Sequence, residues 1–196
     1  MAEQPQAITL DIGGLELAAL AWGAPTGRPF LATHGWLDNA ATMGRLAPRL
    51  CADADLRIVS LDLPGHGLSQ HKQGPYHFID WVADLIAAAD ALGWERFGLL
   101  GHSMGAGIST LVAGTVPERI DRCVLLDGIG PMSDEPKLAA KRLTRSLRVE
   151  AGKRESTKRL FASPEVAAKR LLEATQMDPS SAARLIARGV VEVEGG

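Results

Sequence analysis

Short apolar runs alternate with longer amphipathic segments over the first two thirds of the chain. The runs occupy residues 30–33, 57–61, 97–100 and 123–126. The segments between them that have helical character are residues 40–50, 78–92 and 106–116. Strands that alternate with helices predict a mostly parallel sheet flanked by helices, in an α/β fold. Such sheets bind ligands beyond the carboxyl ends of their strands, so we expect the site there.

The two ends of the chain follow other patterns. Residues 8–10 and 15–20 flank a Gly13-Gly14 turn and predict an antiparallel pair of strands. Beyond Pro131 the alternation stops, and the helices expected there are residues 137–150, 153–161, 164–175 and 179–188.

The helical block resembles an insertion or the start of a lid over a sheet. Pro164 and Pro179 suit first-turn positions, with Ser163 and Asp178 as caps. Residues 190–193 could begin an extended segment. We therefore divide the chain into an N-terminal core at 1–131, a partial helical lid at 132–189 and a truncated end at 190–196.

Composition and charge are ordinary for a globular protein, with 46% hydrophobic and 22% charged residues. A net charge of −2 gives no global field that would attract nucleic acid or an anionic membrane, and we expect neither as a partner. Residues 131–196 hold 13 Lys and Arg against 9 Asp and Glu. This excess predicts a solvated helical region, with a basic binding surface as the alternative.

The two cysteines and the N-terminus carry little functional information. Cys51 and Cys123 have no metal-ligand or disulfide-scaffold spacing, and the apolar run around Cys123 predicts a buried thiol. The first residues lack the basic start and apolar core of a signal peptide, and no stretch is apolar enough to span a bilayer. We therefore expect a cytoplasmic protein.

Gly101-His102-Ser103-Met104-Gly105 lies between a predicted strand and a predicted helix. It matches G-x-S-x-G, in which a strained turn lifts the serine hydroxyl above the sheet and the glycines allow close packing. A phosphate-binding loop is the alternative, but the Walker Gly-Lys-Ser/Thr and a dinucleotide G-x-G-x-x-G are both absent. The pattern therefore predicts that Ser103 is a nucleophile.

With two further motifs, the chain resembles the α/β-hydrolase superfamily. These motifs are His34-Gly35-Trp36 and the run from Asp62 to Ser69, Asp-Leu-Pro-Gly-His-Gly-Leu-Ser. The resemblance is to the lid-bearing branch with esterases, epoxide hydrolases, haloalkane dehalogenases and serine-hydrolase-like proteins. The last are the most similar, through residues 34–39 and 125–131. The resemblance to the superfamily is good over residues 8–131 and loose over the helical remainder.

The resemblance implies an α/β-hydrolase fold and hydrolysis of a carboxylic ester or similar small acyl substrate. Ser103 would attack the carbonyl, whereas the dehalogenases and epoxide hydrolases have Asp at that position. The backbone N–H groups of Trp36 and Met104 would form the oxyanion hole. No metal or organic cofactor is implied.

The remaining candidate residues have supporting interpretations. We expect His34 and His102 to pack around the site, together with Gly35 and the serine-motif glycines Gly101 and Gly105. Asp62 and His66 are expected to fix the turn after their strand, and Asp38 to cap the helix that follows.

Asp127 ends the strand after the serine helix. Some family members have their catalytic acid at this position, whereas in others the acid comes from the next strand. Both interpretations of Asp127 stay open.

The family pattern breaks off after Ser103. Its triad follows the order Ser, acid, His, yet no histidine follows Ser103; the five histidines are His34, His66, His71, His77 and His102. We therefore expect a C-terminally incomplete hydrolase that lacks its last strands and is inactive or weak alone. Residues 123–126 would then form an exposed edge strand that favours self-association. A non-catalytic binding or interaction protein is the alternative.

Overall fold

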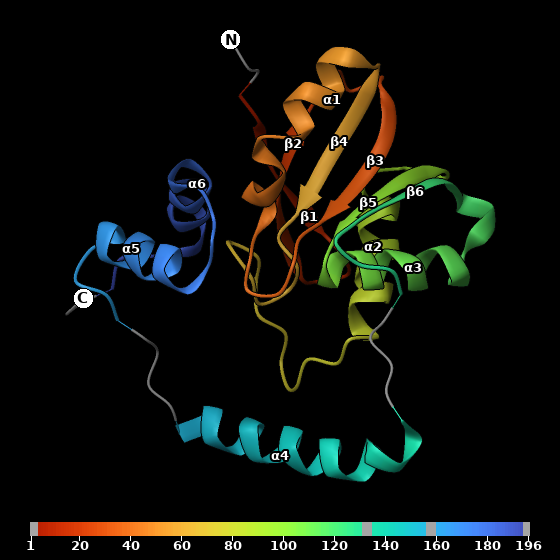
Figure 1. The fold of residues 1–196 in the computed structure, drawn as a ribbon. Helices are drawn as coiled ribbons and strands as arrows, with labels where there is room; N and C mark the ends of the chain where they lie inside the picture. Colours follow the sequence, from red (N-terminus) through yellow and green to blue (C-terminus); the bar gives the residue numbers. More distant parts are fainter. Residues whose placement is uncertain (1–3, 131–134, 156–159, 194–196) are drawn as a thin grey trace.

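A six-stranded sheet forms the centre of this computed structural model, which describes residues 4–130, 135–155 and 160–193 (Figure 1). The strand order is β1-β2-β4-β3-β5-β6. The strands are β1 (Gln6–Asp11), β2 (Glu16–Trp22), β3 (Arg28–Thr33), β4 (Leu56–Leu61), β5 (Phe97–His102) and β6 (Ile120–Leu126). β1 and β2 form the predicted antiparallel pair, and β4, β3, β5 and β6 run parallel. The predicted sheet is thus confirmed.

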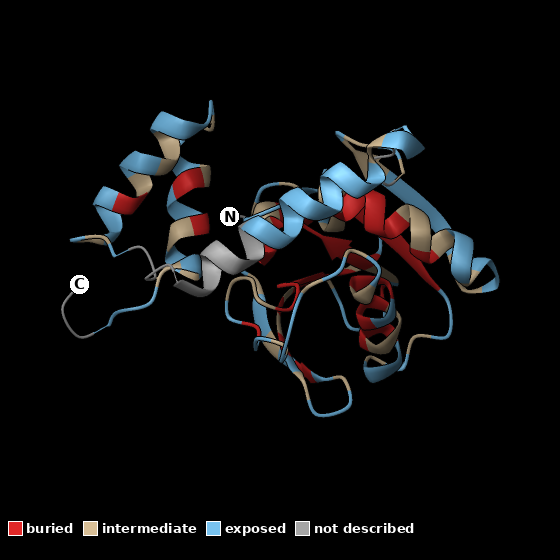
Figure 2. Cartoon of the chain, turned by 90° about the horizontal axis from the view of Figure 1, so that it is seen from below, coloured by how far each residue is buried: buried red, intermediate tan, exposed pale blue. Residues whose placement is uncertain are grey.

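Helices cover both faces of the sheet, and burial is concentrated between them and the strands (Figure 2). α2 (Asp80–Ala91) and α3 (Met104–Thr115) pack on the larger apolar cluster, whereas α1 (Ala47–Asp53) contributes to a smaller one around Trp22. The single helix expected at 40–50 is instead a 3₁₀ helix, η1 (Ala40–Gly44), followed by α1. Asn39, and not Asp38 as expected, caps η1 by accepting the Ala41 N–H.

α3 lies so close to the sheet that two glycines are required at the contact. A Cβ on Gly101 would lie 2.5 Å from the Gly105 carbonyl oxygen, and a Cβ on Gly105 would lie 2.5 Å from the Thr33 carbonyl oxygen. Thr33 Oγ1 also donates to the Gly105 carbonyl at 3.2 Å. The first turn of α3 is therefore fixed against β3 and β5 at the point where Ser103 lies.

β6 forms one edge of the sheet, as predicted, and pairs only with β5 among the described residues. Most of its side chains are exposed, including Val124 and Cys123. The expectation of a buried Cys123 thiol is therefore wrong. An apolar strand buries its side chains only where other elements cover them, and the described elements that contact β6, mainly β5 and α3, leave Cys123 and Val124 exposed.

Three further helices follow the sheet: α4 (Ala139–Glu155), α5 (Pro164–Ala174) and α6 (Pro179–Gly189). The short 3₁₀ helices η2 (Pro117–Arg119) and η3 (Pro136–Leu138) precede β6 and α4. Ser163 and Asp178 cap α5 and α6 as predicted, with Pro164 and Pro179 in their first turns. None of the helices in the described ranges is long and apolar enough to cross a membrane.

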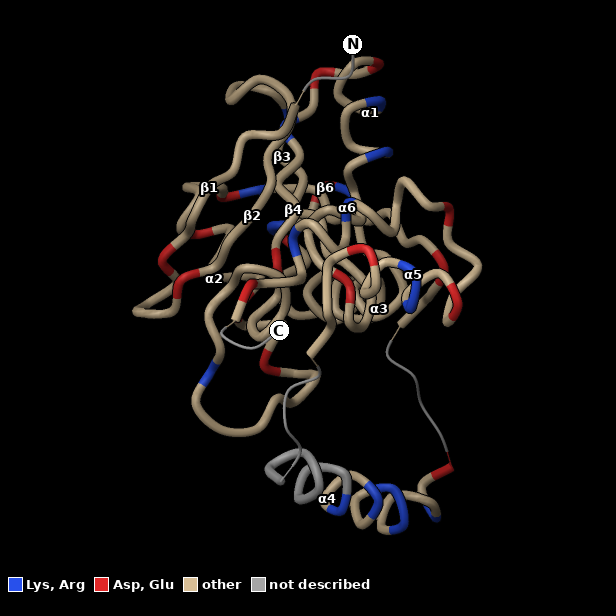
Figure 3. The backbone as a smooth tube through the Cα atoms, turned by 90° about the vertical axis from the view of Figure 1, so that its left-hand side faces the viewer, with Lys and Arg blue, Asp and Glu red and all other residues tan. Residues whose placement is uncertain are grey.

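The helix boundaries at 150 and 153 were wrong, because α4 runs without a break through Gly152 to Glu155. A single glycine weakens a helix by only about 1 kcal/mol relative to alanine. The helical residues on both sides of Gly152 can outweigh this cost. Residues 156–159 of the second expected helix, the boundary at 131–132 and residues 194–196 lie outside the described ranges. The side chains described in α4 are exposed, and Lys and Arg are frequent along it (Figure 3).

α6 is anchored to the sheet core through Asp62, a fully buried carboxylate at the end of β4. Arg188 Nε donates to both Asp62 oxygens, at 3.1 and 2.9 Å. The same carboxylate accepts the Ala40 N–H at 2.6 Å and the Leu68 N–H at 2.9 Å. Asp62 thus fixes its own turn, as predicted, and also joins the loop before η1 to α6.

Gly105→Ala is expected to destabilise the fold by at least about 2 kcal/mol, because the new methyl group collides with β3 backbone. Gly114→Ala is the matched control on the same helix, where a Cβ meets nothing within 4 Å. It should stabilise the protein by about 0.5–1 kcal/mol. Urea unfolding of the two variants measures both effects. Equal shifts for the two would contradict the close-contact argument.

Arg188→Met is expected to lower the free energy of unfolding by about 3–5 kcal/mol, because it leaves the buried Asp62 carboxylate without its cation. Arg45→Met is the control, since Arg45 forms an exposed ion pair with Asp178 at the other end of α6. That pair is solvated, and its loss should change stability far less. Denaturant titration compares the two, and a similar loss for both would show that α6 is not anchored through Asp62.

Candidate active site

Ser103 occupies a strained turn between β5 and α3. Its φ and ψ are 51° and −112°, in the half of conformational space that non-glycine residues rarely adopt. The turn is held by its backbone: the Ser103 N–H donates to the Leu126 carbonyl at 2.9 Å, and the Gly105 N–H to the His34 carbonyl at 3.1 Å. The side chain is exposed, and its hydroxyl forms no hydrogen bond with any described residue. This geometry presents the hydroxyl to an incoming molecule.

The Ser103 turn borders a cavity of about 670 Å³. Trp36 and Met104, the two predicted oxyanion donors, both line it. Met104 is the first residue of α3, where backbone N–H groups have no acceptor within the helix and the helix dipole favours negative charge. Trp36 lies in the turn from Gly35 to Asp38, in which the Asp38 N–H donates to the Gly35 carbonyl at 3.2 Å. The two predicted donors and the predicted nucleophile therefore share one cavity.

Asp127 lines the same cavity, directly after β6. Its φ of 54° is also left-handed, and the next residue, Gly128, packs close to the Ser103 carbonyl. The Asp127 carboxylate forms no hydrogen bond or ion pair with a described residue. The structure therefore brings this candidate acid to the Ser103 cavity without a partner for it among the described side chains.

His34 is committed to the backbone beneath the site. Its Nε2 accepts the Leu63 N–H at 3.1 Å, so Nδ1 carries the proton and donates to the Gly35 carbonyl at 2.7 Å. Complete burial lowers the pKa of His34 to about 3, which keeps the ring neutral. His34 therefore supports the Gly35-Trp36 turn, as expected, and has no nitrogen left for proton transfer to Ser103.

His66 stacks beside His34 and Trp36, with ring centroids 5.0 and 5.8 Å apart. Burial lowers the pKa of this ring as well. It lies among the aromatic rings behind Trp36 and does not line the Ser103 cavity.

His102 faces away from Ser103, toward α6. It lines a separate small cavity of about 170 Å³ with Asp38 and Leu185. The closest charged atom is Asp38 Oδ2, 3.8 Å from His102 Nδ1, which is too long for a hydrogen bond. Burial raises the pKa of Asp38. The supporting role expected for His102 is therefore at the α6 contact.

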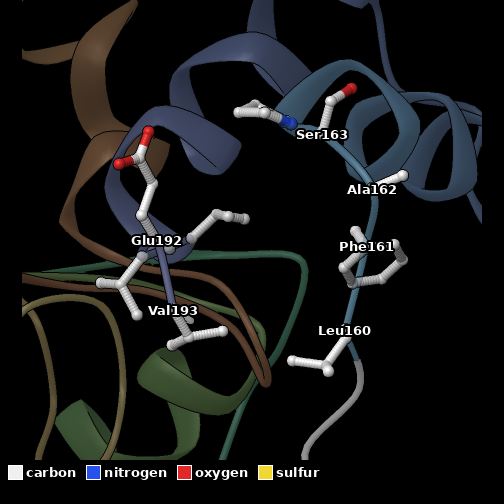
Figure 4. Close-up of a pocket in the computed structure, with 10 residues that line it drawn as sticks. Leu160, Phe161, Ala162, Ser163, Glu192 and Val193 are labelled. Atoms are coloured by element: carbon white, nitrogen blue, oxygen red, sulfur yellow. The ribbon is translucent and has the colours of Figure 1, made fainter. Parts of the chain in front are cut away.

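A third cavity, of about 490 Å³, lies away from these residues, between the segments 160–164 and 189–193 (Figure 4). Leu160 and Phe161 lie on one side of it and Val193 on the other. Ser163 lines this cavity too, but its Oγ accepts the Val166 N–H at 3.4 Å as the cap of α5. The surroundings are those of helix packing. The Ser163 hydroxyl also contacts the exposed Glu165 carboxylate in the first turn of α5, and this hydrogen bond lowers the pKa of Glu165.

The cavity lining includes side chains that the sequence patterns did not single out: Tyr76, Phe78 and Trp81. Three aromatic residues within six positions can be seen in the sequence as a candidate apolar cluster. Only the fold shows that they line the same cavity as Trp36. Arg188 was missed as well, because nothing in a solvated helix pattern indicates a buried partner 126 residues away.

Stability is expected to fall as the solution is acidified, because the unfolded imidazole of His34 binds a proton below its ordinary pKa of 6.5 and the buried one does not until about 3. The stability that the neutral His34 contributes is fully present above pH 6.5. Between pH 6.5 and about pH 3 the free energy of unfolding falls by about 1.4 kcal/mol for each pH unit of acidification. Urea unfolding between about pH 7.5 and about pH 5 tests this. His34→Asn should lower the slope by that amount, and an unchanged slope would assign it to other groups.

Comparisons with known proteins agree with this fold. A crystal structure of a hypothetical protein from Pseudomonas aeruginosa PAO1 is 41% identical, with a TM-score of 0.88 over 100% of this chain and 68% of that one. The thioesterase domain from the curacin biosynthetic pathway is 26% identical, with a TM-score of 0.85 over 99% of this chain and 71% of that domain. Serine hydrolase-like protein 2 of Homo sapiens is 35% identical over 190 residues.

The match to the human protein covers 92% of this chain but 59% of that protein, so the chain spans little more than half of this relative's length. The family model for the alpha/beta hydrolase fold matches residues 28–187, which include the Ser103 turn and the helices that follow the sheet. This chain belongs to the α/β-hydrolase family.

Proposed function

We propose that this chain is the nucleophile-bearing part of a serine hydrolase that cleaves a carboxylic ester or a similar acyl compound. The observation that carries the proposal is the left-handed backbone of Ser103, which turns an exposed hydroxyl toward a cavity of about 670 Å³. The likeness of this chain to a thioesterase domain supports an acyl substrate. The serine hydrolase-like relatives support the same reaction class.

The reaction would begin with attack of Ser103 Oγ on the substrate carbonyl carbon, with the hydroxyl proton passing to a base. The Trp36 and Met104 N–H groups would donate to the resulting oxyanion, where removing one such donor typically costs a factor of about 10²–10³ in rate. Collapse of the tetrahedral intermediate releases the alcohol and leaves an acyl-serine. Water then attacks the ester of Ser103 and frees the carboxylic acid.

The base is the element that the described residues do not supply. All five histidines of the chain are described, and none lines the Ser103 cavity. Without a base the serine hydroxyl stays protonated and reacts slowly. We propose that an acid and a histidine, with Asp127 as one candidate acid, complete the site in the whole protein, and that this chain alone is weak or inactive.

A second candidate function is favoured by the same observation. A cavity with an oxyanion hole but no base could bind an acyl compound without turning it over. The chain would then act as a non-catalytic binding or interaction protein.

A fluorophosphonate probe is expected to label this chain slowly, at Ser103. Added imidazole, which accepts protons, should raise the rate. Ser103→Ala should remove the labelling, whereas Ser163→Ala, the matched cavity serine elsewhere in the fold, should keep it. Mass spectrometry of the labelled peptides reads both results. A folded sample in which Ser103 stays unlabelled with and without imidazole would favour the non-catalytic function.

A further inference from the structure

The cavity beside Ser103 has an aromatic wall. Four rings line it, two from indoles, one from a phenol and one from a phenyl group, and Met104 and Ile129 add aliphatic surface. The rings belong to Trp36, Tyr76, Phe78 and Trp81. They come from the loop after β3, from the segment that leads into α2 and from the first turn of α2, so the fold brings them together and no single motif does.

Trp81 is the centre of this wall and is only 3% exposed. Its ring centroid lies 6.4 Å from Trp36, 6.1 Å from Phe78 and 6.4 Å from Tyr76. The Trp36 and Phe78 contacts are edge-to-face. Because the rings pack against one another, the wall is rigid and formed before any ligand binds. A preformed apolar wall favours an apolar group that can displace water from it.

The charged residues that line the cavity limit the charge of the ligand that it can bind. Asp127 is the one charged residue among those described as lining the cavity, and no Lys or Arg lines it. A carboxylate on the acyl group would meet a carboxylate and no cation, at the cost of its own desolvation. Trp81 is buried and offers no open face to a cation, but Trp36 is 55% exposed, so a cationic group is the alternative that the titration below separates.

We propose that this cavity binds an uncharged apolar acyl group, such as phenylacetyl or hexanoyl, and discriminates against acyl groups that carry a second carboxylate. The inference extends the proposed function, because it names the acyl class that Ser103 would attack. The binding preference itself does not require turnover, so it can be measured on this chain without a base.

The test is a binding titration of the whole chain, followed by intrinsic tryptophan fluorescence, with ligands that no hydrolase step consumes. The probes are N-methylphenylacetamide, N-methylsuccinamate and an amide of the same size that carries a trimethylammonium group. Trp36 and Trp81 line the cavity and report on its occupation. The phenylacetamide is expected to bind at least about tenfold more tightly than the succinamate.

One substitution should change the preference without disturbing the core. Ile129 lines the cavity and is 88% exposed, so Ile129→Lys places a cation there with little cost to folding. It should tighten succinamate binding by about tenfold. Leu68→Lys is the control, because Leu68 is also exposed but does not line the cavity. Circular dichroism of both variants checks that the fold is retained.

Three results would overturn the inference: equal binding of succinamate and phenylacetamide, tightest binding of the trimethylammonium amide, or no binding of any probe up to its solubility limit. None of them depends on the reactivity of Ser103. Conversely, a clear preference for phenylacetamide in a chain that the fluorophosphonate never labels would leave the binding preference standing and favour the non-catalytic function.

Discussion

The arrangement of the site depends on how closely the first turn of α3 approaches β3 and β5. Only glycine fits at positions 101 and 105, where a Cβ would lie 2.5 Å from a backbone oxygen. The same contact lets the Gly105 N–H reach the His34 carbonyl and the Ser103 N–H reach the Leu126 carbonyl. The strained Ser103 backbone costs of order 1–3 kcal/mol and persists because these contacts over-determine it. The loops after three neighbouring strands are thus tied to one turn, which is why Ser103, the predicted oxyanion donors and Asp127 reach one cavity.

A second constraint acts behind this turn, at Asp62. Its carboxylate accepts two backbone N–H groups from different loops and the Arg188 guanidinium from α6. Asn39 Nδ2 adds a bond to the Leu185 carbonyl, also in α6, at 2.8 Å. A buried ion pair of this kind is weak evidence for stability, since desolvation offsets the attraction, but it does fix the relative position of the groups that it joins. α6 therefore contacts the loop that carries Trp36, through Asn39.

The sequence could predict most of the sheet because the signals involved are local. Apolar runs of four to six residues and the Ser163 and Asp178 caps act within one element, and the structure has each of them where it was expected. The wrong predictions concern residues whose environment is set by tertiary contacts. Cys123 is exposed because β6 is an edge strand, and η1 is capped by Asn39 because the preceding residue, Asp38, faces His102 and Thr42 instead. The aromatic wall and the Arg188 ion pair join segments that only the complete topology brings together, so no window of sequence indicates them.

The histidines show that binding and proton transfer are separate parts of this site. His34 is neutral and has both nitrogens in backbone hydrogen bonds, and His102 faces α6. His34 could take the Ser103 proton only by giving up the hydrogen bonds that hold the Gly35-Trp36 turn, and His102 lines a different cavity from Ser103. The predicted oxyanion donors and the proposed acyl cavity, in contrast, are built from backbone and from rings that need no proton movement. Such elements keep their geometry when a base is absent, and in serine hydrolases they alone leave a residual acceleration of about 10³–10⁴ over water. If the proposed function holds, the reactivity of Ser103 in this chain measures what positioning and electrostatics contribute when proton transfer is left to the solvent.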